Sequence, residues 1–181
     1  MRIIAGELKG RRLKTPTWDG LRPTSDKLRE TLFNVIADRL ENARFLDGFA
    51  GTGAVGFEAL SRGATHVTFV ERDARARRLI EENAKKCGVT DGYIIVRGGL
   101  DGKGQTDLGP FDLIFLDPPY GDSVILRAMR AAATWLSPTG LLIVEHAARD
   151  SIVEPSGMRL TRDLRSGDSA LAFMEKVSEN A

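Results

Sequence analysis

The chain has 181 residues, of which 42% are hydrophobic and 28% charged, and a formal net charge of +1 at pH 7. These values are typical of a soluble globular protein and exclude disordered, collagen-like and membrane-spanning chains. The length predicts a single domain over residues 1–181. With one cysteine and two histidines that lack other ligands at metal-binding spacing, we expect a cytoplasmic protein with no internal disulfide and no metal.

The positive charge is concentrated at the N-terminal end. Residues 1–30 contain eight Lys and Arg residues against four acids, whereas the rest of the chain contains 18 bases against 21 acids. This asymmetry predicts an anionic partner at that end. A solvated basic hairpin that only aids solubility explains the charge equally well, so the choice depends on other motifs.

The first predicted elements are a small basic hairpin and a helix. Residues 2–6 and 11–16 are short, β-compatible segments on either side of a Gly/Lys-rich connection, which predicts the hairpin. The segment Thr24-Ser25-Asp26 supplies an N-cap hydroxyl and an acid for the first turn, ahead of apolar residues at helical spacing, and this pattern predicts a helix over roughly residues 25–41.

From Phe45 onward, short apolar segments alternate with segments of helix length, and this pattern predicts an α/β fold with a parallel sheet. We expect strands near residues 45–50, 66–71, 93–97, 111–116 and 140–146. Helices are expected near residues 54–62, 73–87 and 123–135, with Asp73 capping the middle one. The last part of the chain predicts a hairpin with strands at residues 158–164 and 170–177 and a turn at residues 165–168.

A Gly-x-Gly-x-x-Gly motif at Gly51, Gly53 and Gly56 lies between the first predicted strand of this sheet and the helix that follows. Glycines at this place let the backbone approach a ligand closely, and Glu71, at the end of the next strand, can accept both hydrogen bonds of a ribose diol. The two features together predict a site for an adenosine cofactor. A tight turn beside a strand-end surface acid is the structural alternative.

Asp47, which ends the strand before the glycine motif, separates two possible cofactors. A carboxylate there suits an α-ammonium group and disfavours a pyrophosphate, so it favours S-adenosylmethionine over a nicotinamide dinucleotide. The alternative is a strand-end acid that accepts hydrogen bonds from nearby backbone N–H groups.

The sharpest motif is Asp117-Pro118-Pro119-Tyr120, which follows the very apolar segment 111–116. An exocyclic amino group of a base is a poor nucleophile because its lone pair is delocalised into the ring. The Asp117 carboxylate and the Pro118 carbonyl can each accept one N–H of that group, and the prolines add stiffness without a competing donor. Tyr120 offers a face on which the base can stack. A proline-rich turn after a buried strand is the structural alternative.

These motifs resemble the RsmD family, the bacterial methyltransferases that modify the N2 amino group of one guanine in small-subunit ribosomal RNA. The resemblance rests on segments 1–6, 10–13, 22–26, 29–34, 47–53, 58–64 and 117–120, in this order. It implies a Rossmann-like, seven-stranded S-adenosylmethionine-dependent methyltransferase fold with a terminal antiparallel hairpin. It also implies that residues 1–24 form a basic extension that grips RNA, ahead of the helix and catalytic core in residues 25–181.

The resemblance further implies S-adenosylmethionine as the methyl donor and 16S ribosomal RNA, within assembling small subunits, as the substrate. The small size of the chain predicts a monomer. The predicted catalytic residues are Asp117, Pro118, Pro119 and Tyr120. The predicted cofactor contacts are Asp47, Phe49, Ala50, Gly51, Thr52, Gly53, Glu71, Arg72, Leu100 and Asp117. The predicted RNA contacts are Arg2, Lys9, Arg11, Arg12, Lys14, Arg22, Thr24, Lys27 and Arg29.

The sequence departs from the family where an acid often follows the third strand to bind the adenine amino group. This chain has Arg97-Gly98-Gly99-Leu100-Asp101 at that place, so either Asp101 or backbone groups must hold the adenine. Three other functions remain open from the residues: an adenine methyltransferase acting on DNA, a nicotinamide oxidoreductase, and a non-catalytic RNA-binding assembly factor. A nicotinamide oxidoreductase leaves the Asp117-Pro118-Pro119-Tyr120 motif unexplained.

Overall fold

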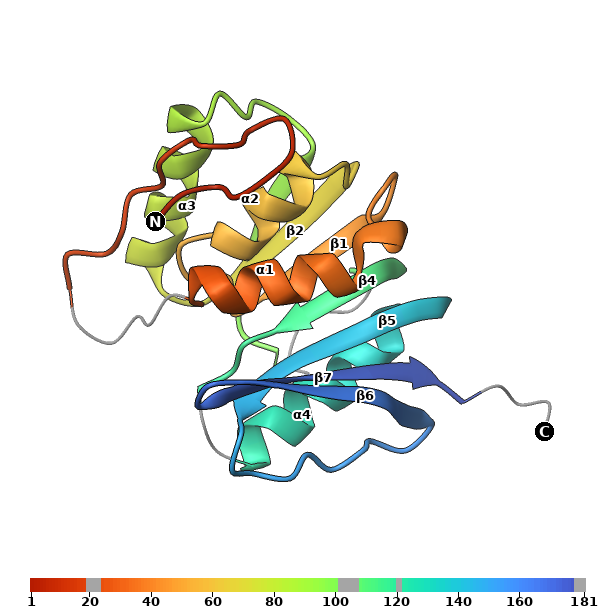
Figure 1. Ribbon diagram of the computed structural model, residues 1–181. Helices are drawn as coiled ribbons and strands as arrows, with labels where there is room; N and C mark the ends of the chain where they lie inside the picture. Colours follow the sequence, from red (N-terminus) through yellow and green to blue (C-terminus); the bar gives the residue numbers. More distant parts are fainter. Residues whose placement is uncertain (19–23, 101–107, 120–121, 178–181) are drawn as a thin grey trace. The chain divides into compact units, whose positions relative to one another are not determined.

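The computed structural model in Figure 1 describes residues 1–18, 24–100, 108–119 and 122–177. The chain divides into two compact units, a first unit Met1–Gly99 and a second unit Leu100–Ala181, and each is described by itself. The single domain expected from the length stays a prediction. Within the described ranges, no helix is both long enough and apolar enough to span a membrane.

The first unit is built on three parallel strands, β1 (Arg44–Gly48), β2 (His66–Glu71) and β3 (Tyr93–Arg97), in the order β3-β2-β1. Helix α2 (Ala54–Ser61) connects β1 to β2, and α3 (Ala74–Lys86) connects β2 to β3. The predicted bounds of β2 and β3 are confirmed. The first strand ends before residue 50 because Phe49 has a φ of 67°, which a strand cannot contain.

Helix α1 (Asp26–Val35) begins as predicted, since the Ser25 side chain accepts a hydrogen bond from the Leu28 N–H at 3.2 Å. The predicted end at residue 41 is wrong. Ile36 leaves the helical conformation with φ −100° and ψ 10°, and a short 3₁₀ helix, η1 (Ala37–Arg39), follows. Ile36 and Leu40 are nevertheless buried, so the apolar spacing continues although the α-helix does not.

The N-terminal arm, defined as residues 1–18, forms a looser hairpin than predicted. It contains a single isolated antiparallel bridge, Arg2 to Arg12, instead of two strands. Ile3 and Leu13 are buried, so they anchor the arm within the first unit, of which it is a part. In Figure 1 the arm is the dark red trace that runs beside α2 and α3.

The second unit contains β4 (Phe111–Leu116) and β5 (Leu136–Ala147), which are parallel and connected by α4 (Asp122–Trp135). Strands β6 (Met158–Ser166) and β7 (Ser169–Lys176) form an antiparallel hairpin, and the strand order is β4-β5-β7-β6. The terminal hairpin is confirmed, with a tighter turn than predicted, since only residues 167–168 lie between the strands. Gly167 allows this turn because it adopts a φ of 65°.

Candidate functional site

The glycine-rich loop, residues 49–53, connects β1 to α2 in the first unit. Gly53 is the N-cap of α2 and has a φ of 76°, in the left-handed region that favours glycine. Its N–H donates to the Ala50 carbonyl at 2.7 Å. The positive φ of Phe49 is uncommon for a residue with a side chain and is a feature found at ligand-binding turns. The loop therefore presents mainly backbone at the N-terminus of α2.

Asp47 lies at the end of β1, with only 2% of its surface exposed. Its Oδ2 accepts a hydrogen bond from the Gly56 N–H at 2.9 Å, inside the first turn of α2. A negative charge there interacts favourably with the helix dipole. This backbone contact is the alternative role considered for Asp47, and its role toward a cofactor ammonium group stays a prediction.

Glu71, at the end of β2, holds the glycine-rich loop from the neighbouring strand. One carboxylate oxygen accepts the Gly51 N–H at 2.9 Å, and the other accepts the Asp73 N–H at 2.8 Å. Because a carboxylate has about four lone-pair sites, each oxygen keeps the capacity to accept a further hydrogen bond. Of the two strand-end acids that the sequence singled out, Glu71 thus binds the loop from β2, and Asp47 binds the first turn of α2 from β1.

The first turn of α3 begins beside Glu71 with a charged cluster. Asp73 caps the helix, as predicted, by accepting the Arg75 N–H at 2.8 Å. The Arg75 guanidinium also bonds this carboxylate and lowers the pKa of Asp73 to about 2. Arg75 stacks on the Trp18 ring at 5.1 Å. The side chain of Arg72, a predicted cofactor contact, is exposed beside this cluster.

In the second unit, Asp117, Pro118 and Pro119 follow β4 directly, as predicted. Pro118 is buried, Asp117 is half-buried and Pro119 is exposed, whereas Tyr120 lies outside the described residues. Leu100 is buried with 3% of its surface exposed, and Asp101 lies outside the described residues. The roles of these residues toward cofactor and base stay predictions.

Most of the predicted RNA contacts lie on the surface of the first unit. The exposed ones are Arg2, Lys9, Arg11, Arg12, Lys14 and Lys27. Thr24 is half-buried, and Arg22 lies outside the described residues. Two of the exposed side chains also have partners in the protein: Arg11 donates to the Cys87 carbonyl, and Lys14 pairs with Glu82 at 2.8 Å.

Arg29 does not fit its predicted role as an RNA contact, because its side chain is fully buried. Its guanidinium pairs with Asp26 at 2.6 Å, lies 3.6 Å from a carboxylate oxygen of Glu58 in α2, and donates to the Arg2 carbonyl at 3.0 Å. The positive charge of Arg29 is therefore used to hold α1, α2 and the N-terminal arm together. We therefore remove Arg29 from the predicted RNA-binding set.

Sequence reasoning missed three polar residues that attach the N-terminal arm to the helices: Glu58, Ser61 and Asn83. The Glu58 carboxylate accepts the N–H groups of Ile4 and Ala5 at 2.8 and 3.0 Å. Ser61 accepts the Leu8 N–H at 2.9 Å. A signal for Glu58 exists in the sequence, because a charged residue inside the apolar segment 54–61 requires buried partners.

Two other side chains of interest are structural in this protein. Cys87 is fully buried, and burial raises the pKa of its thiol, so the reactive thiolate is disfavoured. His146 is buried in β5, with Nε2 3.1 Å from Asp163 and Nδ1 3.1 Å from the Ala147 carbonyl.

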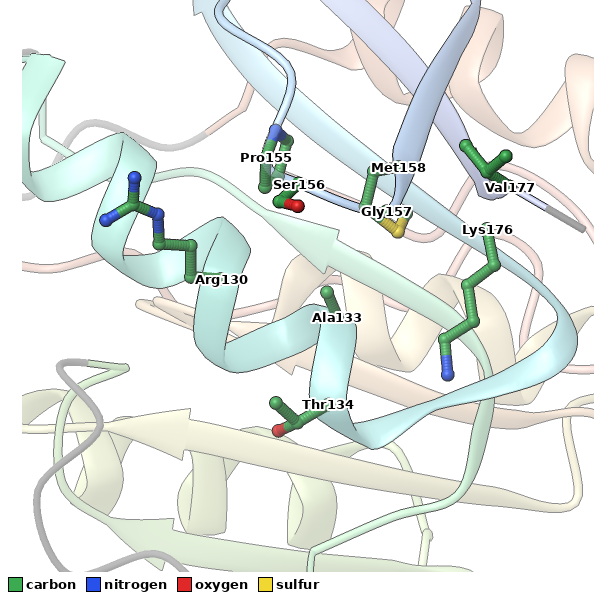
Figure 2. Close-up of a pocket in the computed structure, with 9 residues that line it drawn as sticks. All are labelled: Arg130, Ala133, Thr134, Pro155, Ser156, Gly157, Met158, Lys176 and Val177. Atoms are coloured by element: carbon green, nitrogen blue, oxygen red, sulfur yellow. The ribbon is translucent and has the colours of Figure 1, made fainter. Parts of the chain in front are cut away.

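A cavity of about 690 Å³ lies within the second unit, between α4 and the hairpin of β6 and β7 (Figure 2). Arg130 and Lys176 are its charged lining residues, and the rest of its lining is apolar or carries a hydroxyl group. The lining includes no carboxylate and none of the predicted site residues. The cavity is therefore separate from the predicted chemistry.

Comparisons with known proteins connect this geometry to a family. The family model described as "Conserved hypothetical protein 95" matches residues 1–175. The chain is 37% identical over 172 residues to "Ribosomal RNA small subunit methyltransferase D" of Haemophilus influenzae, covering 92% of this chain and 89% of that protein. It is 31% identical to the protein of the same name from Escherichia coli K12, covering 99% and 91%. The solved structure of yhhF from Escherichia coli has a TM-score of 0.85 at 32% identity and 99% coverage of both chains.

Proposed function

The chain belongs to the family described as "Conserved hypothetical protein 95", the RsmD family, and on this premise we propose that it methylates the N2 amino group of a guanine in 16S ribosomal RNA. Family membership confirms the resemblance deduced from the motifs, the Rossmann-like seven-stranded fold and the methyltransferase activity. The name of its relatives, a methyltransferase of small-subunit ribosomal RNA, supports the substrate class.

The geometric observation that carries the proposal is a pair of strand-end acids, of which Glu71 binds the glycine-rich loop and Asp47 binds the helix turn that follows it. Glu71 has acceptor capacity for the two hydroxyl groups of a ribose, and Asp47 supplies negative charge at the end of β1. The loop between them presents backbone, so a ligand can approach closely. These residues fit S-adenosylmethionine. Glu71 would hold the ribose, Asp47 would hold the ammonium group, and the glycine-rich loop would line the space between them.

The segment after β4 is proposed to bind the base that receives the methyl group. When bound, S-adenosylmethionine supplies an electrophilic methyl group that needs no further activation. Asp117 and the Pro118 carbonyl accept the two N–H groups of the guanine amino group and favour a pyramidal nitrogen whose lone pair can attack. Tyr120 stacks on the base, which contributes about 1–3 kcal/mol. The nitrogen releases its extra proton to Asp117 or to water.

The finer parts of the proposal concern where and on what the enzyme acts. We propose that the substrate is the RNA in assembling small subunits, that the enzyme is a cytoplasmic monomer, and that the reaction needs no metal. The exposed basic residues of the N-terminal arm support the RNA contact, because Lys and Arg neutralise phosphate charge. The relatives are named for ribosomal RNA, so they favour RNA over DNA adenine as the substrate.

The test is transfer of radiolabelled methyl groups from S-adenosylmethionine to unmodified small-subunit particles, followed by mass spectrometry of the nucleosides. The expected product is N2-methylguanosine at one site, and Asp117→Ala serves as the inactive control. Naked 16S ribosomal RNA and adenine-containing DNA are tested in parallel. Methylation of DNA adenine, or of another RNA base, would overturn the guanine-N2 assignment, and RNA binding without any transfer would leave only an assembly factor.

A further inference from the structure

Asn83 lies in the last turn of α3, fully buried, between two segments that are far apart in the sequence. Its Nδ2 donates to the Thr52 carbonyl at 3.0 Å and to the Lys14 carbonyl at 3.2 Å. Its Oδ1 accepts the Lys14 N–H at 2.7 Å. Both hydrogens and one oxygen lone pair of this amide are therefore used, and one side chain connects the N-terminal arm to the glycine-rich loop.

The arm also determines how this amide is oriented. The Lys14 N–H can only donate, so the atom that faces it must be the amide oxygen, and the NH₂ group then points toward the two carbonyls. If the arm leaves, the amide loses its two bonds to Lys14 and can rotate away from Thr52. The contact of Asn83 with the glycine-rich loop thus depends on the position of the arm.

Two further contacts strengthen this connection. The Lys14 ammonium group pairs with Glu82, the residue before Asn83, at 2.8 Å. The Thr52 hydroxyl lies 3.9 Å from the Met1 sulfur, so the arm also reaches the loop directly. Thr52 lies between Gly51, whose N–H binds Glu71, and Gly53, the N-cap of α2. A shift of the Thr52 peptide therefore moves the groups that are proposed to hold the cofactor.

We propose that Asn83 is a positioning residue that couples RNA binding on the N-terminal arm to cofactor binding at the glycine-rich loop. This inference rests on the proposed function, because it requires both ligands. RNA that holds the basic arm against α3 fixes the amide on Thr52 and organises the loop. By thermodynamic linkage, the cofactor must then raise the affinity for RNA by the same factor.

The experiment measures binding of labelled S-adenosylhomocysteine, which cannot be consumed, by equilibrium dialysis with and without unmodified small-subunit particles. For the wild-type protein we expect the particles to lower the Kd by about five-fold or more, the lower end of typical coupling factors. In Asn83→Ala the ratio of the two Kd values should fall to near one. Asn83→Asp keeps the acceptor for Lys14 but loses the NH₂ group, so it should lose the coupling too.

Ser61→Ala is the matched control. Ser61 also binds the arm to a helix, since its hydroxyl accepts the Leu8 N–H and donates to the Ala5 carbonyl, and both of these partners lie in the arm and not in the loop. This variant should weaken particle binding and keep the coupling ratio, whereas a role of Asn83 in stability alone would leave the ratio of Asn83→Ala at the wild-type value. A wild-type ratio in Asn83→Ala, or equal losses of coupling in both variants, would overturn the proposal.

Hydrogen exchange of the wild-type protein provides a second measurement that needs no variant. Particles added without cofactor should slow exchange of the amides in residues 49–56, and unchanged exchange there would contradict the coupling. Failure of the proposed function is distinguishable, because the wild-type protein would then transfer no methyl group to the particles. A protein that methylates the particles but shows a coupling ratio of one keeps the function and loses this inference.

Discussion

The glycine-rich loop after β1 and the segment Asp117–Pro119 after β4 both follow a buried parallel strand, but they present opposite chemistry. The loop presents mainly backbone: Glu71 accepts the Gly51 N–H of the loop, and Asp47 accepts the Gly56 N–H in the first turn of α2. The segment after β4 has a carboxylate and two prolines, which carry carbonyls and no N–H. The first suits a ligand held by backbone and acids, and the second suits an amino group that donates two hydrogen bonds.

The largest expected effect comes from placing a hydrogen-bond donor in the segment Asp117–Pro119, which is proposed to accept hydrogen bonds from the base. In Asp117→Asn an NH₂ group replaces one acceptor oxygen and faces the N–H groups of the base. We expect the single-turnover methyl-transfer rate to fall by about 10²–10³-fold, as when one preorganised hydrogen-bonding group is removed from other enzymes. Cofactor affinity, measured by calorimetry, should be largely unchanged, and an unchanged rate would remove Asp117 from the mechanism.

The corresponding substitution beside the glycine-rich loop is Glu71→Gln. It places an NH₂ group among the N–H donors of Gly51 and Asp73 and removes the charge proposed to hold the ribose. We expect cofactor binding to weaken by about 1.5–3 kcal/mol, which is about 10-fold to 150-fold in Kd. Glu81→Gln, on the exposed face of α3, is the control and should bind like wild type. Equal affinities of Glu71→Gln and the control would contradict the ribose contact.

The packing that holds the loop against the sheet can be tested at Gly56. A Cβ added there would overlap the ring of Phe69 in β2, so α2 cannot stay in place without rearrangement. We expect Gly56→Ala to lower the free energy of unfolding by about 1–3 kcal/mol, as overpacked cores do. A Cβ at Gly99 meets nothing within 4 Å, so Gly99→Ala should leave urea unfolding unchanged. Equal stabilities of the two variants would refute the packing constraint.

The smallest effect concerns the acid at the start of α3. The pKa of Asp73 is lowered from 3.8 to about 2 by Arg75. Its contribution to stability is therefore complete above about pH 4 and is lost as the pH falls toward 2. Asparagine also caps helices well, so Asp73→Asn removes the charge and keeps the cap. The difference between the unfolding free energies of wild type and Asp73→Asn, measured with urea, should shrink as the pH falls from 5 to 3. A difference that is constant over this range would contradict the ion pair.

The sequence predicted those parts of the fold that local patterns determine. The bounds of β2, β3 and β4 were predicted correctly because buried parallel strands give short apolar runs between clear helix signals. The end of α1 was wrong because a 3₁₀ turn preserves the burial of Ile36 and Leu40 and so leaves the apolar spacing unchanged.

The contacts of the N-terminal arm could not be predicted in the same way. Its backbone binds side chains of Glu58 and Asn83, which lie more than 50 residues away, and no local pattern encodes such distant pairs. Arg29 was misassigned for the same reason, since charge alone does not distinguish a buried partner of Glu58 from a surface RNA contact. The positions of Asp47 and Glu71 were easier to predict, because the ends of parallel strands lie at one edge of a sheet, whereas their roles toward a cofactor stay predictions.

The most direct test of the contrast between the two segments is rescue by cofactor concentration. Single-turnover methyl transfer to small-subunit particles is measured for Glu71→Gln and Asp117→Asn as S-adenosylmethionine is raised to saturation. The account predicts that Glu71→Gln approaches the wild-type rate, because its defect is in binding, whereas Asp117→Asn stays slow at every concentration. Recovery of Asp117→Asn at high cofactor, or failure of Glu71→Gln to recover, would contradict the assignment of Glu71 to cofactor binding and of Asp117 to the transfer step.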